Sequence, residues 1–348
     1  MRSTNGWSAK HLGAAGSVIT ASVGSATWSA KAPALDGPKI PAAGNRQIDY
    51  VRVWWEPFHP LTSRRVTVNV YAVANIVNVE MAKAWDGAEG AYWADNAASY
   101  ERTTRRFWGR LREQVPIAED ERAIDIGCGN GAKTCDLARA APSGSALGID
   151  LSRPMLENAR RRAAANGVTN VRFVHGDAQA YTFEPGVATM ATSSFGCMFF
   201  ADPVAAFRNI GNGLSSGGRL ALLAWREFSR NEWMSAIRGA LAPELPPPPP
   251  VGPRSWADPD RVRNLLSAAG YADIELASVD DMADMGADAD AAYEFLNSDG
   301  FVRGALEQVG DEGREERLAR MRSVLDSRAT PDGVLLPASA WLVTARKG

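Results

Sequence analysis

The sequence predicts an α/β fold built on a doubly wound, Rossmann-like parallel sheet that begins near residue 122. Two observations carry this prediction. Short apolar runs alternate with helical segments from residue 122 onward, and a glycine-rich loop follows the first run. Strands that alternate with helices form parallel sheets covered on both faces. The chain has 348 residues, of which 45% are hydrophobic, so it can bury a sizeable core.

The elements follow in order along the chain. After helical segments at about 87–114, strands are expected at 122–126, 146–150, 171–175, 187–193, 218–225, near 272–279 and at 339–346, and helices at 132–141, 153–166, 202–213 and 259–269. A proline-rich break from Leu245 to Pro253 precedes the last of these helices. That helix has the clearest end signals, with Asp258 as N-cap, Pro259 at its first position and Gly270 just after its end.

Residues 1–80 have a different composition from the rest. Over residues 1–48, Gly, Ala, Ser and Trp are scattered without a helical or strand period, which predicts disorder or a stretch foreign to the native chain. Residues Val66 to Val79 alternate apolar and polar side chains, as a strand or hairpin does. The stretch from Leu12 to Ala30 is too polar for the apolar region of a signal peptide. We therefore expect 1–80 to be an extension and 81–348 the folded domain.

Composition excludes several classes of protein. A net charge of -2 and a pI near 6.0 give no reason to expect a nucleic-acid partner. No stretch approaches the roughly 20 apolar residues of a membrane span. Three cysteines without framework spacing suit a reducing compartment, which predicts a cytoplasmic protein. Of three histidines only His175 lies beyond residue 80, so we expect no metal site.

The segment from Ile124 to Gly131 carries the central signal, an apolar strand that runs into a glycine loop and a helix. Glycines let a backbone turn sharply and approach a ligand closely. Gly127, Gly129 and Ala132 also match a dinucleotide fingerprint, so an NAD site is an alternative. A pyrophosphate, however, disfavours a neighbouring carboxylate. Asp125 therefore favours a ligand with an ammonium and a sulfonium, which is S-adenosylmethionine.

Two further strand ends carry an acid. Asp150 ends the second strand, where it can accept hydrogen bonds from a ribose diol. Ser152 then caps the next helix, and Met155 lies one turn further on. Asp177 and Ala178 follow the third strand, where the acid can accept from an adenine amino group.

These motifs together resemble those of class I S-adenosylmethionine-dependent methyltransferases, and most of all the group that includes the ubiquinone/menaquinone-biosynthesis methyltransferases. The resemblance covers about residues 81–348 and includes Gly148 to Asp150, Gly176 to Ala178, the pair Gly217-Gly218, Trp85 to Gly87, Ser194 to Gly196, Met198 to Pro203 and Trp341 to Ala345. It departs at Ser215-Ser216, where the family usually has a proline before its glycine pair. It implies a seven-stranded sheet with an antiparallel last strand and helical cap insertions. It also implies leading helices at 81–120, a cofactor-binding core at 121–225, and cap and C-terminal strands at 226–348.

The resemblance implies a role for each candidate. Asp125 and the glycine loop hold the methionine part, Asp150 the ribose, and Asp177 with Ala178 the adenine, while two tyrosines of the leading helices lie over the cofactor. The full set expected to contact S-adenosylmethionine is Asp125, Gly127, Cys128, Gly129, Gly131, Asp150, Leu151, Met155, Asp177, Ala178, Tyr92 and Tyr100.

The acceptor side is expected after the fourth and fifth strands, because an open α/β sheet binds ligands beyond the carboxyl ends of its strands. Residues expected there are Ser193, Ser194, Phe195 and Trp225, with Trp233, Met234 and Trp256 as an apolar wall. His175 and Ser194 are the only candidates for a catalytic role, and no base is unambiguous. We expect methyl transfer to a small apolar acceptor. An NAD-dependent oxidoreductase, or a paralogue that binds S-adenosylmethionine without turnover, are the alternatives.

Overall fold

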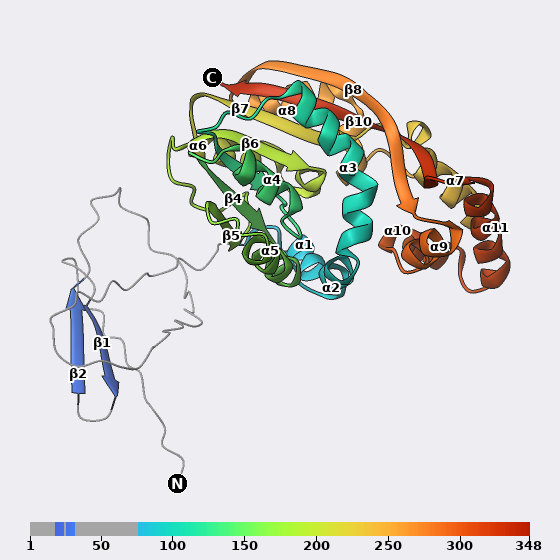
Figure 1. The fold of residues 1–348 in the computed structure, drawn as a ribbon, viewed down its shortest axis with the longest axis horizontal. Coiled ribbons are helices and arrows are strands. Elements are labelled where there is room, and N and C mark those ends of the chain that lie inside the picture. Colours follow the sequence, from blue (N-terminus) through green and yellow to red (C-terminus); the bar gives the residue numbers. More distant parts are fainter. Residues whose placement is uncertain (1–17, 24–25, 32–75) are drawn as a thin grey trace, which may run out of the picture. The chain divides into compact units, whose positions relative to one another are not determined.

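The computed structural model describes residues 18–23, 26–31 and 76–348, which belong to two compact units (Figure 1). In the first unit, β1 (Val18–Val23) pairs antiparallel with β2 (Ala26–Lys31). The sequence, which shows no strand period over residues 1–48, did not predict these two strands. Both strands contain β-branched residues, and the sequence between them is Gly24-Ser25, a dipeptide typical of tight hairpins. Of the alternating segment Val66 to Val79, residues 66–75 lie outside the described residues, and Val79 begins a helix.

The second unit contains a mixed sheet whose strands follow the order β5-β4-β3-β6-β7-β10-β8, with the short β9 paired to β10. The strands are β3 (Arg122–Ile126), β4 (Ser145–Asp150), β5 (Val171–His175), β6 (Ala188–Ser194), β7 (Leu214–Trp225), β8 (Tyr271–Gly286), β9 (Ala329–Thr330) and β10 (Gly333–Lys347). Strands β3 to β7 pair in parallel, whereas β10 runs antiparallel to both of its neighbours β7 and β8. The predicted fold class, with its antiparallel last strand, is confirmed.

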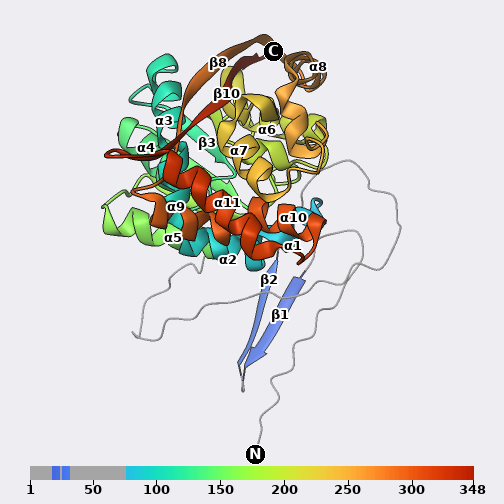
Figure 2. The same cartoon turned by 90° about the vertical axis from the view of Figure 1, so that its right-hand side faces the viewer.

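Helices cover both faces of this sheet and form a cap beyond it (Figures 1 and 2). The α-helices are α1 (Val79–Trp85), α2 (Ala88–Asp95), α3 (Ala97–Gln114), α4 (Ala132–Ala140), α5 (Arg153–Ala165), α6 (Pro203–Gly213), α7 (Glu232–Leu241), α8 (Pro259–Ala268), α9 (Ala289–Asn297), α10 (Gly300–Val309) and α11 (Arg314–Ser327). Short 3-10 helices are η1 (Gly196–Phe199), η2 (Phe228–Arg230) and η3 (Gly252–Ala257). Crossovers between parallel strands are right-handed as a rule, so those from β3 toward β5 place α4 and α5 on one face of the sheet, and those from β6 toward β8 place α6 and α8 on the other.

The chain order explains where the cap lies. Helices α9, α10 and α11 fall between β8 and β10, and α7 falls between β7 and β8, so all four leave the sheet at its carboxyl end (Figure 2). In that view α11 packs against α7 and α9. The N-caps that the sequence predicted are present, since Ser152 accepts from Met155 N and Asp258 from the N–H groups of Asp260 and Arg261.

Strand β8 is longer than the sequence predicted, because it continues through residues 280–286, a stretch that contains three aspartates. Asp281 pairs with Arg106 and Arg110 of α3, and Asp284 pairs with Arg102 of the same helix. Carboxylates that are paired in this way can lie in a strand that faces a basic helix. The long strands β8 and β10 and helix α3 therefore support the cap over the end of the sheet.

Candidate functional site

One large cavity of about 630 Å³ opens at the carboxyl ends of β3, β6 and β7, between the glycine loop, the leading helices and the cap. The predicted candidates that line it are Asp125, Gly127, Cys128, Gly129, Gly131, Met155, Tyr100, Ser194, Phe195 and Trp225. The candidates that do not line it are Asp150, Leu151, Asp177, Ala178, Tyr92, Ser193 and His175. The structure thus brings the methionine-side candidates and most acceptor-side candidates into one space.

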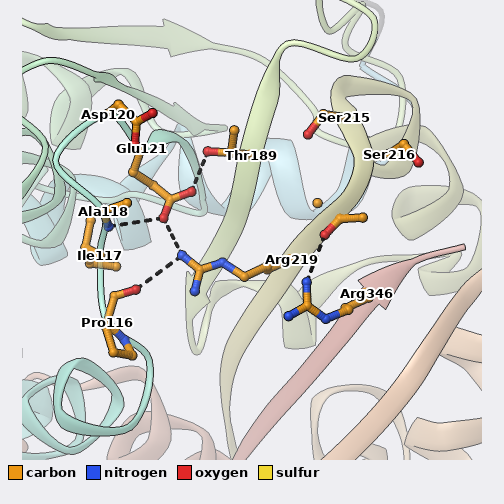
Figure 3. A pocket seen from close by; sticks show the side chains of 12 residues that line it. Pro116, Ile117, Ala118, Asp120, Glu121, Thr189, Ser215, Ser216, Arg219 and Arg346 are labelled. Carbon is orange, nitrogen blue, oxygen red and sulfur yellow. Dashed lines mark hydrogen bonds and ion pairs between the residues drawn. The ribbon is translucent and has the colours of Figure 1, made fainter.

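A second hollow lies at the opposite end of the sheet, with a volume of about 470 Å³ (Figure 3). Three of its charged side chains, those of Glu121, Arg219 and Arg346, already have partners. Glu121 is buried and binds Arg219 and Thr189, and Arg346 donates to the carbonyl of Gly217 at 3.2 Å. Ser215 and Ser216, the residues that replace the family's proline, lie on its rim. This hollow contains none of the predicted site residues.

The glycine loop of the large cavity needs its glycines for conformation and for space. Gly127 has φ +66°, a region that L side chains rarely adopt, and a Cβ there would lie 2.9 Å from Gly196 Cα. The N–H groups of Gly127 and Cys128 both donate to the carbonyl of Ile149. The loop is therefore fixed between β4 and the turn after β6, which carries the acceptor-side candidates.

Asp125 lies at the wall of the cavity and is almost fully buried. It accepts a hydrogen bond of 2.6 Å from the Thr134 hydroxyl. Burial raises the pKa of Asp125 to about 7, an effect that the Thr134 hydrogen bond and the nearby Lys133 oppose. A carboxylate in such a place gains most from a cationic partner that replaces lost solvation.

Asp150 lies directly behind the glycine loop. One carboxylate oxygen accepts from Gly129 N and the other from Ser152 N, both at 2.8 Å. Burial raises the pKa of Asp150, and these backbone hydrogen bonds oppose the rise. A carboxylate has about four lone-pair sites, so two remain for a ligand hydroxyl. Met155, one turn into α5, faces the cavity beside Gly129.

Asp177 is in a position that the sequence did not foresee, because the chain just upstream of α1 binds it. Its Oδ2 accepts from the N–H groups of Val77 (3.0 Å) and Asn78 (2.8 Å), and its Oδ1 accepts from Gln179 N. The Asn78 amide donates to the carbonyl of Phe199 at 2.9 Å. Asp177 is 2% exposed and Ala178 is also buried. The segment 76–78 therefore joins the loops that follow β5 and β6.

The two tyrosines tie the leading helices to the cap. Tyr100 lines the cavity, stacks on Trp93 with ring centroids 3.4 Å apart, and donates to Asp299 at 2.6 Å. Tyr92 donates to the carbonyl of Phe295 at 2.6 Å, and mainly its burial raises the pKa of Tyr92 to about 12. Both hydroxyls are therefore bonded to the cap and stay protonated at neutral pH.

The acceptor half of the cavity has an aromatic wall. Phe195 has φ +68°, which is uncommon for a residue other than glycine, and stacks on Trp225 with centroids 4.0 Å apart. Trp233 meets Trp225 edge-on at 5.5 Å, and Phe301 continues the row at 6.0 Å from Trp233. Ser194 lies beside this wall, and within residues 76–348 its buried hydroxyl has no hydrogen-bond partner.

Two acceptor-side candidates lie away from the cavity. Ser193 is fully buried, and its hydroxyl donates to Ile126 O at 2.8 Å and accepts from Cys197 N at 2.9 Å. Trp256 is 3% exposed and packs against Phe207 in the core, outside the cavity. Alternate residues of a strand face opposite sides, which separates Ser193 from Ser194.

His175 lies outside the cavity, with Nε2 3.0 Å from the carbonyl of Leu151. Burial lowers the pKa of His175, so the ring is neutral at pH 7. In the part of the chain that the structure describes, no group of three His, Cys, Asp or Glu residues could hold a metal ion. In the same part, no helix is long and apolar enough to cross a membrane.

Several lining residues were missed by sequence reasoning because nothing in their local sequence marks them. They are Trp85, Trp93, Thr104, Lys133, Phe228, Arg254 and Phe295. Trp85 packs edge-on against Trp93 and Phe199. An aromatic residue on an amphipathic helix usually signals packing, so only the fold could assign these side chains to the site.

A family model described as a methyltransferase domain matches residues 123–218, which run from β3 to the start of β7 and include the glycine loop. Residues 123–218 therefore match a methyltransferase domain. Class I methyltransferases use S-adenosylmethionine as their methyl donor, and the buried Asp125 beside the glycine loop fits the cationic methionine part of that cofactor.

Similar proteins agree with this assignment. Demethylmenaquinone methyltransferases of Staphylococcus aureus, from strain JH9 and strain Newman, are 31% identical to the chain over 131 residues. The match covers 37% of this chain and 53% of the relative, so the chain spans about half the length of the curated relatives it matches.

Solved structures give weaker similarities. YcgJ from Bacillus subtilis has a TM-score of 0.44 and 18% identity, over 70% of this chain and 98% of that one. Phosphoethanolamine N-methyltransferase 2 from Haemonchus contortus, solved with S-adenosyl-L-methionine, has a TM-score of 0.46 and 18% identity, over 78% of this chain and 60% of that one.

Proposed function

We propose that the protein transfers the methyl group of S-adenosylmethionine to a small, largely apolar acceptor. The observation that carries this proposal is the single cavity, which runs from the glycine loop and Asp125 to the aromatic wall of Phe195, Trp225 and Trp233. A ligand on each side would face the other without an intervening barrier of protein.

The residues at the glycine loop fit the cofactor. Asp125 offers a carboxylate to an ammonium, and the free lone pairs of Asp150 lie behind Gly129 for a ribose diol. When bound, the cofactor supplies an electrophilic methyl on a sulfonium, and methyl transfer removes that positive charge. Such a reaction depends mostly on holding the acceptor close and in line, which can lower the barrier by roughly 7–11 kcal/mol.

The protein's own part is therefore to position and desolvate the acceptor. Flat, stacked rings such as Phe195 on Trp225 bind planar apolar groups well. The Ser194 hydroxyl is a hydrogen-bond donor for one polar atom of the acceptor. The relatives named demethylmenaquinone methyltransferases act, by that name, on demethylmenaquinone, which supports a small-molecule acceptor here.

The experiment is calorimetric titration of the full chain with S-adenosylmethionine and, separately, with NAD. We expect binding of the first and none of the second, because Asp125 would repel a pyrophosphate. The Asp150→Ala variant loses the hydrogen bond between its carboxylate and the ribose, which is worth about 1.5–3 kcal/mol. We therefore expect it to bind the cofactor roughly tenfold to hundredfold more weakly. Asp136→Ala, on the exposed side of α4, is the matched control. Binding of NAD alone would contradict the proposal.

A further inference from the structure

The half of the cavity beside the glycine loop contains a lysine with no charged partner. Lys133 lies in the first turn of α4 and is partly buried, and its Nζ donates to the Thr104 hydroxyl of α3 at 2.8 Å. Within residues 76–348 it forms no ion pair, and the other cations that line the cavity, Arg226 and Arg254, belong to segments after β7.

The neighbouring acids are engaged elsewhere. Glu101 of α3 pairs with Arg162 of α5, and Asp125 accepts from Thr134. Lys133 therefore has one neutral hydrogen-bond acceptor for three N–H donors. Burial lowers the pKa of Lys133, although Glu101 and Asp125 partly restore it. A partly buried ammonium in this condition gains from an anion.

The start of α4 favours an anion at the same place. Gly131 is its N-cap, in the left-handed conformation, and no side chain caps the helix. The first N–H groups and the helix dipole add positive potential near Lys133. Two independent features, a lysine without a counterion and an uncapped helix start, thus converge on one corner of the cavity.

That corner lies next to Asp125. Thr134, the residue after Lys133, is the one whose hydroxyl binds the Asp125 carboxylate, so a cation and an anion face the cavity side by side. The ammonium and the carboxylate of an α-amino acid are attached to the same carbon atom. A site that binds both therefore needs an anionic and a cationic side chain close together. The methionine part of S-adenosylmethionine is an α-amino acid.

We propose that Lys133, oriented by Thr104, binds the α-carboxylate of the methionine part of S-adenosylmethionine, beside the ammonium site at Asp125. This inference rests on the proposed function and assigns a subsite within it. Lys133 then selects for the intact amino-acid end of the cofactor, because a ligand without the carboxylate leaves the lysine unpaired.

The test uses two probes, S-adenosylmethionine and its decarboxylated form, which keeps the sulfonium and the amine but lacks the carboxylate. Calorimetry on the full chain should show that the wild type prefers S-adenosylmethionine by about tenfold or more. In Lys133→Met this preference should disappear, through weaker binding of S-adenosylmethionine and unchanged or tighter binding of the decarboxylated form. Lys83→Met, which removes an exposed lysine paired with Glu80, should leave the preference intact.

The outcomes separate this inference from the proposed function. If the wild type binds both probes equally, or if Lys133→Met weakens both by the same factor, the carboxylate subsite is wrong while the cofactor assignment stands. If the wild type binds neither probe, the proposed function itself fails. If the melting temperature of Lys133→Met is well below that of the wild type, Lys133→Gln replaces it in the same comparison. The wild-type preference between the two probes tests the carboxylate subsite without any variant.

Discussion

Removal of the segment 76–78 should destabilise the methyltransferase domain. Asp177 is 2% exposed, and two of the three N–H groups that it accepts belong to Val77 and Asn78. A chain that starts at Met81 lacks both, together with the first residues of α1. The sequence alone suggested that such a chain would be sufficient, and the contacts with Asp177 argue against it.

The size of the effect follows from the hydrogen bonds lost. A hydrogen bond to a charged group is worth about 1.5–3 kcal/mol, and since water can reach the opened carboxylate we count only one of the two. At about 2–4 °C per kcal/mol, the melting temperature should fall by about 3–12 °C. Cofactor affinity should also fall, because the Asn78 amide no longer fixes the loop at Phe199.

The assay compares melting temperature and S-adenosylmethionine affinity for three proteins, namely the full chain, residues 76–348 and residues 81–348. Residues 76–348 should behave like the full chain, and only the shorter protein should lose stability. Asn78→Ala in the full chain tests the Phe199 contact without truncation. Equal melting and affinity for 76–348 and 81–348 would refute the reasoning.

Three further predictions concern the cavity. Gly127→Ala places a side chain at φ +66° and 2.9 Å from Gly196, a conformational cost of about 1–2 kcal/mol before any clash, so calorimetry should show cofactor binding at least about tenfold weaker. Asp125 is ionised only above its pKa of about 7, so the ratio of wild-type to Asp125→Asn cofactor affinity should rise from pH 6 to pH 8, and a flat ratio would contradict an ammonium at Asp125. Trp225→Leu removes the ring stacked on Phe195, so steady-state kinetics should show a higher KM for the acceptor, and a change in cofactor Kd of the same size would count against a separate acceptor wall.

The parts of the fold that the sequence predicted are those with local signals. Strands β3 to β7 are short apolar runs, and the glycine loop after β3 is contiguous, so both could be recognised. The extension of β8 could not, because Asp281 and Asp284 are stabilised there by arginines about 170 to 180 residues earlier in the chain.

The site shows the same division. Asp125 was recognised from its sequence neighbours. The contact between Asp177 and residues 77–78 could not be, because it uses backbone N–H donors, which do not depend on the residue type. Lys133 became visible only when α3 placed Thr104 beside it. Ser193 and Ser194 are adjacent at the end of β6 and face opposite sides, and only the register of β6 in the sheet decides which of them faces the cavity.

Transfer of a labelled methyl group tests the central claim most directly. The full chain is incubated with S-adenosylmethionine labelled in its methyl group and a small-molecule extract, and mass spectrometry searches for products that carry the label. Our account predicts a labelled apolar product, formed together with S-adenosylhomocysteine and reduced in Asp150→Ala at limiting cofactor concentration. Tight cofactor binding with no labelled product in any fraction would contradict it and indicate a binding protein without turnover.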